Sequence, residues 1–170
     1  MLRHVRLDDL IEIAALECEL FAEMAYSYSG LRQLFDLHGV HWVVAEVDDV
    51  ICGYALVGLD YRRRGWVMSL GVTPAYRRRG IGRTLLERAV EHCRIAHAER
   101  VRLTVRPGHA TARNLYKDVG FTWISEEDHY FGADEPRQVL ERRFDHEPKQ
   151  WGGATPDDPR WIKRSSGSAP

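Results

Sequence analysis

The sequence at residues 76–82 reads Tyr-Arg-Arg-Arg-Gly-Ile-Gly, and its two flanks decide how this part of the chain folds. The segment before it, residues 66–72, is apolar and typical of a strand. The segment after it has the three- and four-residue spacing of an amphipathic helix, with apolar residues at Ile81, Leu85, Leu86, Ala89, Val90, Cys93 and Ala96. A basic, glycine-containing turn at a helix N-terminus favours anions, because its N–H groups lack helical partners and the helix dipole is positive there. The turn therefore predicts a phosphate-binding site.

A second copy of this motif serves as an internal control. Residues 61–65 repeat the first five letters, Tyr-Arg-Arg-Arg-Gly, earlier in the chain. This copy lacks the second glycine and leads into the strand at Trp66 instead of a helix. We interpret it as the charged tip of a β-hairpin.

Length and composition are those of a globular domain. The chain has 170 residues, of which 44% are hydrophobic and 29% are charged, enough for one well-cored domain. The formal net charge of −1 provides no general attraction to polyanions, so we expect neither a nucleic-acid nor a membrane partner.

The cysteines and the chain start bear on the cellular compartment. Cys18, Cys52 and Cys93 show no metal-ligand spacing and no even number for pairing, so we expect three buried thiols, a reducing compartment and no metal site. No apolar run approaches the roughly 20 residues that span a bilayer, and the first residues do not resemble a signal peptide. These features predict a cytoplasmic protein.

The remaining pattern predicts a mixed α/β (α+β) domain over residues 1–144. We expect strands at residues 2–7, 41–47, 51–59, 66–72, 101–105, 121–124 and 139–144, and helices near residues 10–16, 31–37, 81–96 and 111–119. Asp8 is the expected N-cap of the first helix, and Gly120 the left-handed cap of the last. This order predicts a mixed central sheet of six to seven strands, three of them an antiparallel meander, flanked by about four helices. Residues 145–170 are rich in Gly, Pro, Ser and Asp and predict a disordered tail.

Two separated motifs resemble one family. Arg77-x-x-Gly80-x-Gly82, after a strand ending Leu70-Gly71-Val72, resembles the (Gln/Arg)-x-x-Gly-x-(Gly/Ala) signature of the GNAT N-acetyltransferase superfamily. Val105-Arg106, followed by Leu115-Tyr116 and then Gly120-Phe121, resembles the second cofactor motif of that family. The resemblance covers residues 2–144. The segments at residues 116–121 and 129–132 look most like those of protein N-terminal acetyltransferases, with the ribosomal-protein alanine acetyltransferases as the nearest subgroup.

The resemblance implies acetyl-CoA as co-substrate, an amine as acceptor, and a monomer or homodimer. In such a fold, the strand edge would hydrogen-bond the pantetheine arm, and the turn amides and guanidinium groups would hold the pyrophosphate. His109 stands where the family usually has an asparagine that contacts pantetheine, although an exposed loop histidine is the alternative. The cofactor residues implied in this way are Leu70, Gly71, Val72, Arg77, Arg78, Arg79, Gly80, Ile81, Gly82, Arg83, His109 and Asn114.

Acetyl transfer to an amine needs a neutral amine, donors for the developing oxyanion and a proton for the leaving thiolate. Tyr116 occupies the family position of the general acid, with a packed aromatic residue as the alternative role. The position where these relatives often place Glu or His as the base holds Thr104, which cannot act as a base near neutral pH. Other base candidates are Glu23, Asp60 and the cluster Glu126-Glu127-Asp128, which a solvated edge strand would also explain.

These features favour an N-acetyltransferase that works by direct attack in a ternary complex. An α-amine titrates near ~7.7 and a lysine side chain near ~10.4, so the missing base favours an N-terminal amine or a small-molecule amine of low pKa over a lysine side chain. The expected acceptor is a protein or peptide N-terminal amine. A small-molecule amine, such as an antibiotic, a polyamine or an amino-acid-like compound, is the first alternative. A non-catalytic acyl-CoA-binding module is the second. Nucleic-acid binding through the two arginine clusters is disfavoured by the near-neutral charge.

Overall fold

A computed structural model describes residues 1–144 of the chain, and its strands form one seven-stranded sheet in the order β1-β2-β3-β4-β5-β7-β6. The elements are β1 (Leu2–His4), α1 (Leu10–Phe21), α2 (Tyr28–His38), β2 (Val43–Val47), β3 (Val50–Leu59), β4 (Arg64–Val72), α3 (Ile81–Ile95), β5 (Arg100–Val105), α4 (Ala110–Asp118), β6 (Thr122–Glu127) and β7 (Arg137–Arg143). The predicted order of elements and the mixed α/β class are confirmed. The predicted tail at residues 145–170 lies outside the described residues.

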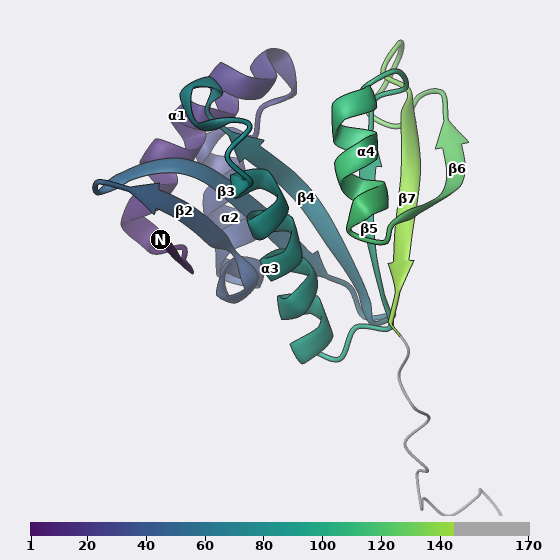
Figure 1. Ribbon diagram of the computed structural model, residues 1–170, viewed down its shortest axis with the longest axis horizontal. Helices are drawn as coiled ribbons and strands as arrows, with labels where there is room; N and C mark the ends of the chain where they lie inside the picture. Colours follow the sequence, from purple (N-terminus) through teal and green to yellow (C-terminus); the bar gives the residue numbers. More distant parts are fainter. Residues whose placement is uncertain (145–170) are drawn as a thin grey trace, which may run out of the picture.

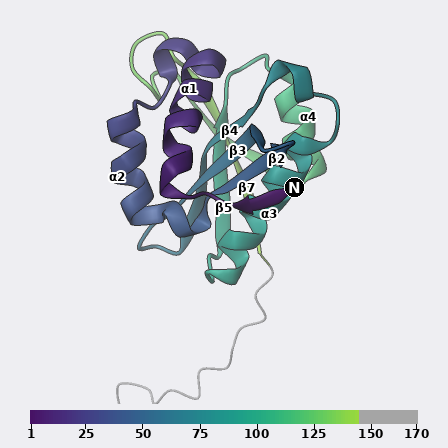
Figure 2. The same cartoon turned by 90° about the vertical axis from the view of Figure 1, so that its left-hand side faces the viewer.

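The sheet is mixed because one pair of neighbouring strands, β4 and β5, is parallel. β2, β3 and β4 form the predicted antiparallel meander, with the charged hairpin tip between β3 and β4. β4 and β5 run parallel and are joined through α3, as a parallel pair requires a long connection. Figures 1 and 2 show α1 and α2 on one face of the sheet, and α3 and α4 on the other.

β4 and β5 separate halfway along their length. Parallel pairing runs only from Arg64 opposite Arg100 to Val67 opposite Leu103. At the same height β4 contains a β-bulge, since Leu56 of β3 pairs with Ser69 while Val57 pairs with Val67, leaving Met68 without a partner. A bulge bends its strand and increases the local twist. From Met68 onward, the edge of β4 that faces β5 therefore pairs with no strand among the described residues.

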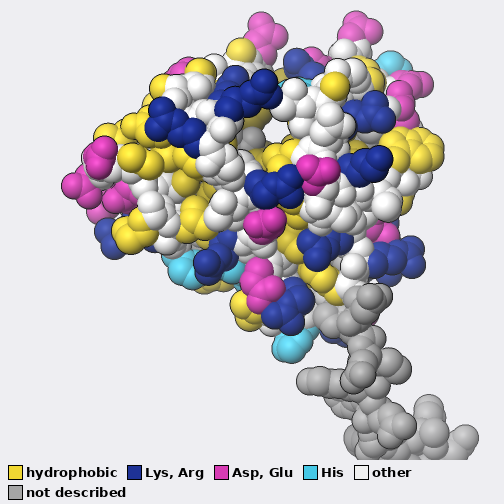
Figure 3. All heavy atoms as spheres, in the orientation of Figure 1, with side chains coloured by type: hydrophobic (Ala, Val, Ile, Leu, Met, Phe, Trp, Pro, Cys, Tyr) yellow, Lys and Arg dark blue, Asp and Glu magenta, His cyan; other side chains and the backbone are white. Residues whose placement is uncertain are grey.

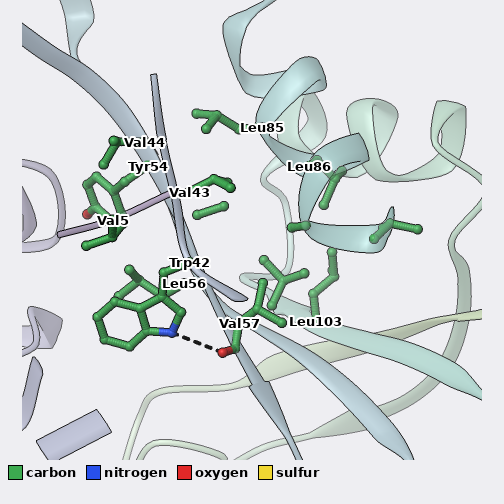
Figure 4. Packing of buried hydrophobic residues seen from close by; sticks show 14 of the residues in the cluster. Val5, Trp42, Val43, Val44, Tyr54, Leu56, Val57, Leu85, Leu86 and Leu103 are labelled. Atoms are coloured by element: carbon green, nitrogen blue, oxygen red, sulfur yellow. Dashed lines mark hydrogen bonds between the residues drawn. The ribbon is translucent and has the colours of Figure 1, made fainter. Parts of the chain in front are cut away.

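The core lies between the sheet and its helices. Trp42 is fully buried, and its indole Nε1 donates a hydrogen bond of 3.0 Å to the carbonyl oxygen of Val57 (Figure 4). On the opposite face, Leu85 and Leu86 of α3 are also fully buried against the strands. Each buried side chain of this size contributes about 1.5–3 kcal/mol of transfer free energy, so packing on both faces fixes the position of β4.

The first residues differ from the sequence expectation. β1 ends at His4 instead of Leu7, and a short 3₁₀ turn at residues 7–9 precedes α1. Asp8 does not cap the helix: the backbone N–H of Arg6 donates to Asp9 Oδ2 at 2.6 Å, so Asp9 closes this turn. Asp9 also forms an ion pair of 2.7 Å with Arg3, which anchors β1 to the start of the helix.

The other boundaries and cysteines are partly as expected. Gly120 has the predicted left-handed conformation, with φ of +90°. Cys52 and Cys93 are buried, as predicted, whereas the prediction of a buried Cys18 is wrong because its side chain is exposed on α1. Within residues 1–144, no helix has the length and apolar character needed to cross a membrane.

Candidate active site

The glycine-containing turn lies between the end of β4 and the start of α3, as the sequence predicted. Arg78 and Gly80 both have left-handed backbone conformations, with φ of +65° and +81°. The amides of residues 78–83 donate to no acceptor among the described residues, and the first bond of the helix runs from Thr84 N to Gly80 O at 3.0 Å. A side chain at Gly80 would meet nothing within 4 Å, so the backbone here is open to a ligand. Unpaired amides at a helix N-terminus fit an anionic group such as a pyrophosphate.

The arginines of this turn are exposed, but they are not equivalent. Arg77 Nε donates to the carbonyl oxygen of Val72 at 3.0 Å, which ties the turn to the end of β4. Arg79 stacks over the ring of Tyr76, 5.2 Å from its centroid, and Arg83 forms an ion pair of 2.7 Å with Asp118 of α4. Figure 3 shows basic side chains around a hollow on this side of the molecule. Their positive charge complements a phosphate-bearing ligand.

The free edge of β4 meets the requirement for a pantetheine arm. Residues 70–72, singled out by sequence, lie beyond the last pair with β5, so their backbone groups on that side bond to no strand among the described residues. The Val72 carbonyl already accepts the hydrogen bond from Arg77. A side chain at Gly71 would approach Leu20 to 2.7 Å and the ring of Tyr54 to 2.8 Å. Gly71 is therefore required for the close packing of α1 and β3 behind this edge.

The larger of two neighbouring cavities begins at this edge. It has a volume of about 380 Å³, and its lining includes Ser69 and Leu70 of β4, Thr104 of β5 and Tyr116 of α4. Phe21, at the end of α1, and residues 23–26, between α1 and α2, contribute to the same cavity. The cavity thus joins the expected donor strand to the expected general acid.

Tyr116 lies in this cavity with its ring packed near Phe121, at a centroid distance of 6.3 Å. Burial raises the pKa of Tyr116 to about 12. A phenol with this pKa keeps its proton throughout the neutral range and can donate it, as a general acid must.

A carboxylate that was not among the residues predicted from the sequence also lies in this cavity. Glu17 of α1 is 1% exposed. Its Oε1 accepts hydrogen bonds from Tyr54 Oη at 2.7 Å and from Ser69 Oγ, and its Oε2 accepts one from the amide of Tyr26 at 3.0 Å. The sequence position of Glu17 indicated burial, since it continues the apolar stripe of Leu10 and Ile13 at helical spacing.

A buried cation is the second cavity residue that was not predicted from the sequence. Arg137 of β7 lines the larger cavity, with its side chain only 8% exposed. It pairs with Glu135 at 2.8 Å and stacks over Phe131 at 4.9 Å. Arg137 lies before the predicted strand at residues 139–144, and a charged residue there gave no indication of a buried position.

A second cavity of about 250 Å³ adjoins the first along β4. The two share Tyr26, Val67, Met68, Thr104 and Phe131. The second is largely aromatic, with Trp66 and Tyr130 in its lining and His38 and Asp60 as polar groups. Together the two cavities form one groove that runs along β4, away from residues 70–72.

The structure places the expected base candidates in different environments. Thr104 lines both cavities, and Glu23 lines the larger one. Asp60 closes the hairpin turn by accepting hydrogen bonds from Arg64 Nε at 2.6 Å and from the amides of Arg62 and Arg64. Desolvation alone would raise the pKa of Asp60, but these hydrogen bonds lower it below its ordinary value. Asp60 is therefore poorly suited to accept a proton.

Neither cavity includes the acids of residues 126–128, His109 or Asn114. Glu126, on the exposed strand β6, accepts a hydrogen bond of 2.9 Å from Gln138 of β7. His109 is exposed and caps α4, since its Nδ1 accepts a hydrogen bond from the amide of Ala112 at 3.3 Å. This matches the alternative of an exposed loop histidine. Asn114 is exposed on α4.

Comparisons with known proteins agree with this geometry. Residues 7–121 match the model of the acetyltransferase (GNAT) family. The chain is 30% identical over 151 residues to an N-alpha-acetyltransferase of Sulfurisphaera tokodaii, covering 82% of this chain and 90% of that protein. It is 35% identical over 109 residues to the N-alpha-acetyltransferase RimI of Mycobacterium tuberculosis, covering 61% of this chain and 66% of that protein.

The fold is also similar to solved structures. The ribosomal-protein-S18-alanine N-acetyltransferase from Escherichia coli superimposes with a TM-score of 0.78 at 18% identity, covering 88% of this chain and 97% of that one. The expected family, fold class and enzyme class are thereby confirmed. The chain belongs to the acetyltransferase (GNAT) family and is an N-acetyltransferase with acetyl-CoA as its co-substrate.

Proposed function

We propose that this enzyme acetylates the α-amine of a peptide or protein N-terminus, by direct attack in a ternary complex. The observation that carries the proposal is the larger cavity, which brings the free edge of β4 together with Tyr116 and two glutamates, Glu17 and Glu23. A primary ammonium is cationic, and such a site attracts it. The named relatives, an N-alpha-acetyltransferase and a RimI-type enzyme, support the same acceptor class.

The donor half of the site is formed by the turn and the strand edge. The unpaired amides of residues 78–83 and the exposed arginines would hold the pyrophosphate of acetyl-CoA. The backbone of residues 70–72 would hydrogen-bond the pantetheine arm as an added strand does. When bound, acetyl-CoA supplies an acetyl group activated as a thioester. His109 and Asn114 remain proposed cofactor contacts.

The reaction half of the site is formed by residues of the cavity. Tyr116 is protonated at neutral pH and would donate its proton to the departing sulfur. A backbone N–H on the free edge of β4 would stabilise negative charge on the thioester oxygen. The second cavity adjoins the first and would give room for residues beyond the terminal one, which favours a peptide over a compact amine.

An acceptor screen tests the proposal. Purified enzyme and acetyl-CoA would be incubated with peptides beginning Ala, Ser or Met, and with polyamines and aminoglycosides, while release of CoA thiol is followed. We expect turnover with at least one peptide, with the acetyl group on its α-nitrogen by mass spectrometry. Turnover of small amines alone would replace the proposed acceptor with the first alternative. Tight acetyl-CoA binding without any acceptor-dependent turnover would support a non-catalytic binding module.

A further inference from the structure

Glu17 is a buried carboxylate whose hydrogen-bond partners within residues 1–144 are all neutral. The donors are the hydroxyl groups of Tyr54 and Ser69 and the amide of Tyr26. No arginine, lysine or histidine of the described chain forms an ion pair with it. A buried charge without a counter-ion is costly, and three oriented donors compensate that cost only in part. The cation of the cavity lining, Arg137, forms its ion pair with Glu135 and not with Glu17. The space of the cavity beside Glu17 is therefore the place for a further positive group.

Ser69 connects this carboxylate to the cavity. It is 9% exposed, it lines the larger cavity, and its Oγ donates to Glu17 Oε1. A serine hydroxyl has one proton to donate and two lone pairs that accept. Because the proton is directed at Glu17, the oxygen can offer the cavity only acceptor capacity. An ammonium, which has donors and no acceptor, is the complementary group.

We propose that Ser69 and Glu17 form a proton relay that deprotonates the acceptor ammonium, which supplies the base missing at Thr104. This inference rests on the proposed function. One N–H bond of the ammonium breaks, its electron pair stays on nitrogen, and the proton bonds to Ser69 Oγ. The original proton of Ser69 moves at the same time to Glu17 Oε1. The products are a neutral amine, an unchanged serine and a protonated Glu17, which returns its proton through Ser69 to water after product release.

The titratable groups around Ser69 and Glu17 are compatible with the relay. Tyr54 from β3 and Tyr26 from the segment before α2 both face Glu17, and burial, followed by the negative charge of Glu17, raises the pKa of each phenol. Both therefore stay protonated, and Tyr54 can hold Oε1 in place. The other titratable groups of the cavity are Glu23, Tyr116 and Arg137. Ser69 would be the residue that touches the substrate, and Glu17 a positioning and proton-accepting residue behind it.

The test compares Glu17→Gln and Ser69→Ala with Glu19→Gln, a matched control for the same chemical change on an exposed face of α1. For each protein, kcat/KM is measured from pH 6.5 to 9.5 with the acceptor found in the screen. We expect both cavity variants to lose about ten-fold or more at pH 7. The loss should shrink to about three-fold or less at pH 9.5, because an α-amine is mostly neutral above its pKa of ~7.7. Acetyl-CoA affinity and thermal unfolding provide the checks on folding.

The pH dependence separates a relay from a purely structural role. A loss of the same size at every pH, with weakened acetyl-CoA binding or a lowered Tm, would overturn the relay. So would full activity of either variant at pH 7, or a Glu19→Gln profile like that of Glu17→Gln. If Glu17→Gln does not fold, the profile of Ser69→Ala decides alone. A wild-type enzyme that acetylates no amine would overturn the proposed function together with the relay, whereas an active wild type with unaffected variants would overturn the relay only.

Discussion

Arg83, at the start of α3, forms an ion pair of 2.7 Å with Asp118, at the end of α4, so this contact joins the two helices that cover the same face of the sheet. The side chains are 44% and 56% exposed. An ion pair this exposed contributes about 0–1 kcal/mol to folding. Arg83 is also a proposed phosphate contact, so Asp118 competes with the ligand for the same guanidinium group.

Replacing Asp118 with Asn should therefore tighten acetyl-CoA binding by about two- to three-fold, since it frees Arg83 and removes a negative charge. The free energy of unfolding should change by less than about 0.5 kcal/mol. Calorimetric titration with acetyl-CoA measures the first effect and urea unfolding the second. Weaker binding by the variant would indicate that the ion pair holds Arg83 in its binding position.

Gly80 provides a sharper test of the turn. Its φ of +81° is unfavourable for any residue with a Cβ, although open space surrounds the position. Gly80→Ala should destabilise the fold by about 1 kcal/mol and, because the turn amides shift, weaken acetyl-CoA binding by about ten-fold or more. The matched control is Gly120→Ala, where φ is +90° and a Cβ would make only ordinary contacts. Equal losses of affinity in both variants would refute a specific role for the turn.

Tyr116→Phe tests the general acid. The hydroxyl is the only group removed, so acetyl-CoA affinity and Tm should stay close to those of the wild type. We expect kcat to fall by about ten-fold or more. Since burial raises the pKa of Tyr116 to about 12, its ionisation should cause no loss of wild-type activity between pH 8 and 10. An unchanged kcat would remove Tyr116 from the mechanism.

The sequence predicted the donor half of the site better than the acceptor half, for a physical reason. The strand, turn and helix around Gly80 are set by local signals: apolar periodicity, a left-handed glycine and a helix start. The environment of Glu17 depends on Tyr54 and Ser69, which are 37 and 52 residues away in sequence. A single glutamate in a helix is usually exposed, and only the donors contributed by two distant strands allow this one to be buried.

The separation of β4 and β5 could not be predicted from the sequence either. It depends on the bulge at Met68 and on the end of pairing at Val67. Neither feature changes the alternating apolar pattern of the β4 sequence. A one-residue slip in register is a property of two strands, so one strand read alone cannot reveal it. Arg137 was missed likewise, because its burial depends on Phe131 and Glu135 in the preceding connection.

Thiol labelling tests the corrected position of Cys18. In the native protein, an aromatic disulfide reagent should react rapidly with one thiol, that of Cys18, which is exposed. Burial raises the pKa of Cys93 to about 12 and also raises the pKa of Cys52, so both stay protonated and shielded. All three cysteines of the sequence should react in denaturant. Labelling of the Cys18→Ser variant in the native state would contradict this arrangement.

A histidine cluster at the junction of β1 and α3 should make folding stability pH-dependent. His4 and His92 stack with ring centroids 4.9 Å apart, and His92 Nδ1 donates to the carbonyl oxygen of His41 at 3.0 Å. Burial lowers the pKa of His41 and of His92 below the ordinary 6.5. Nearby histidines lower the pKa of His41 further, whereas for His92 the hydrogen bond to the His41 carbonyl opposes part of the decrease. The folded state thus takes up protons less readily than the unfolded state.

This contribution to stability is complete above pH 6.5, the ordinary pKa of histidine in the unfolded chain. It is lost as the pH falls from there toward the lowered pKa values of His41 and His92 in the folded protein. The free energy of unfolding, measured in urea from pH 7.5 to 5, should therefore decrease on acidification. His92→Gln keeps a donor for the His41 carbonyl but cannot titrate, so its decrease should be smaller than that of the wild type. His129→Gln, at an exposed position, should retain the wild-type slope. Identical slopes for His92→Gln and wild type would show that the cluster does not control acid stability.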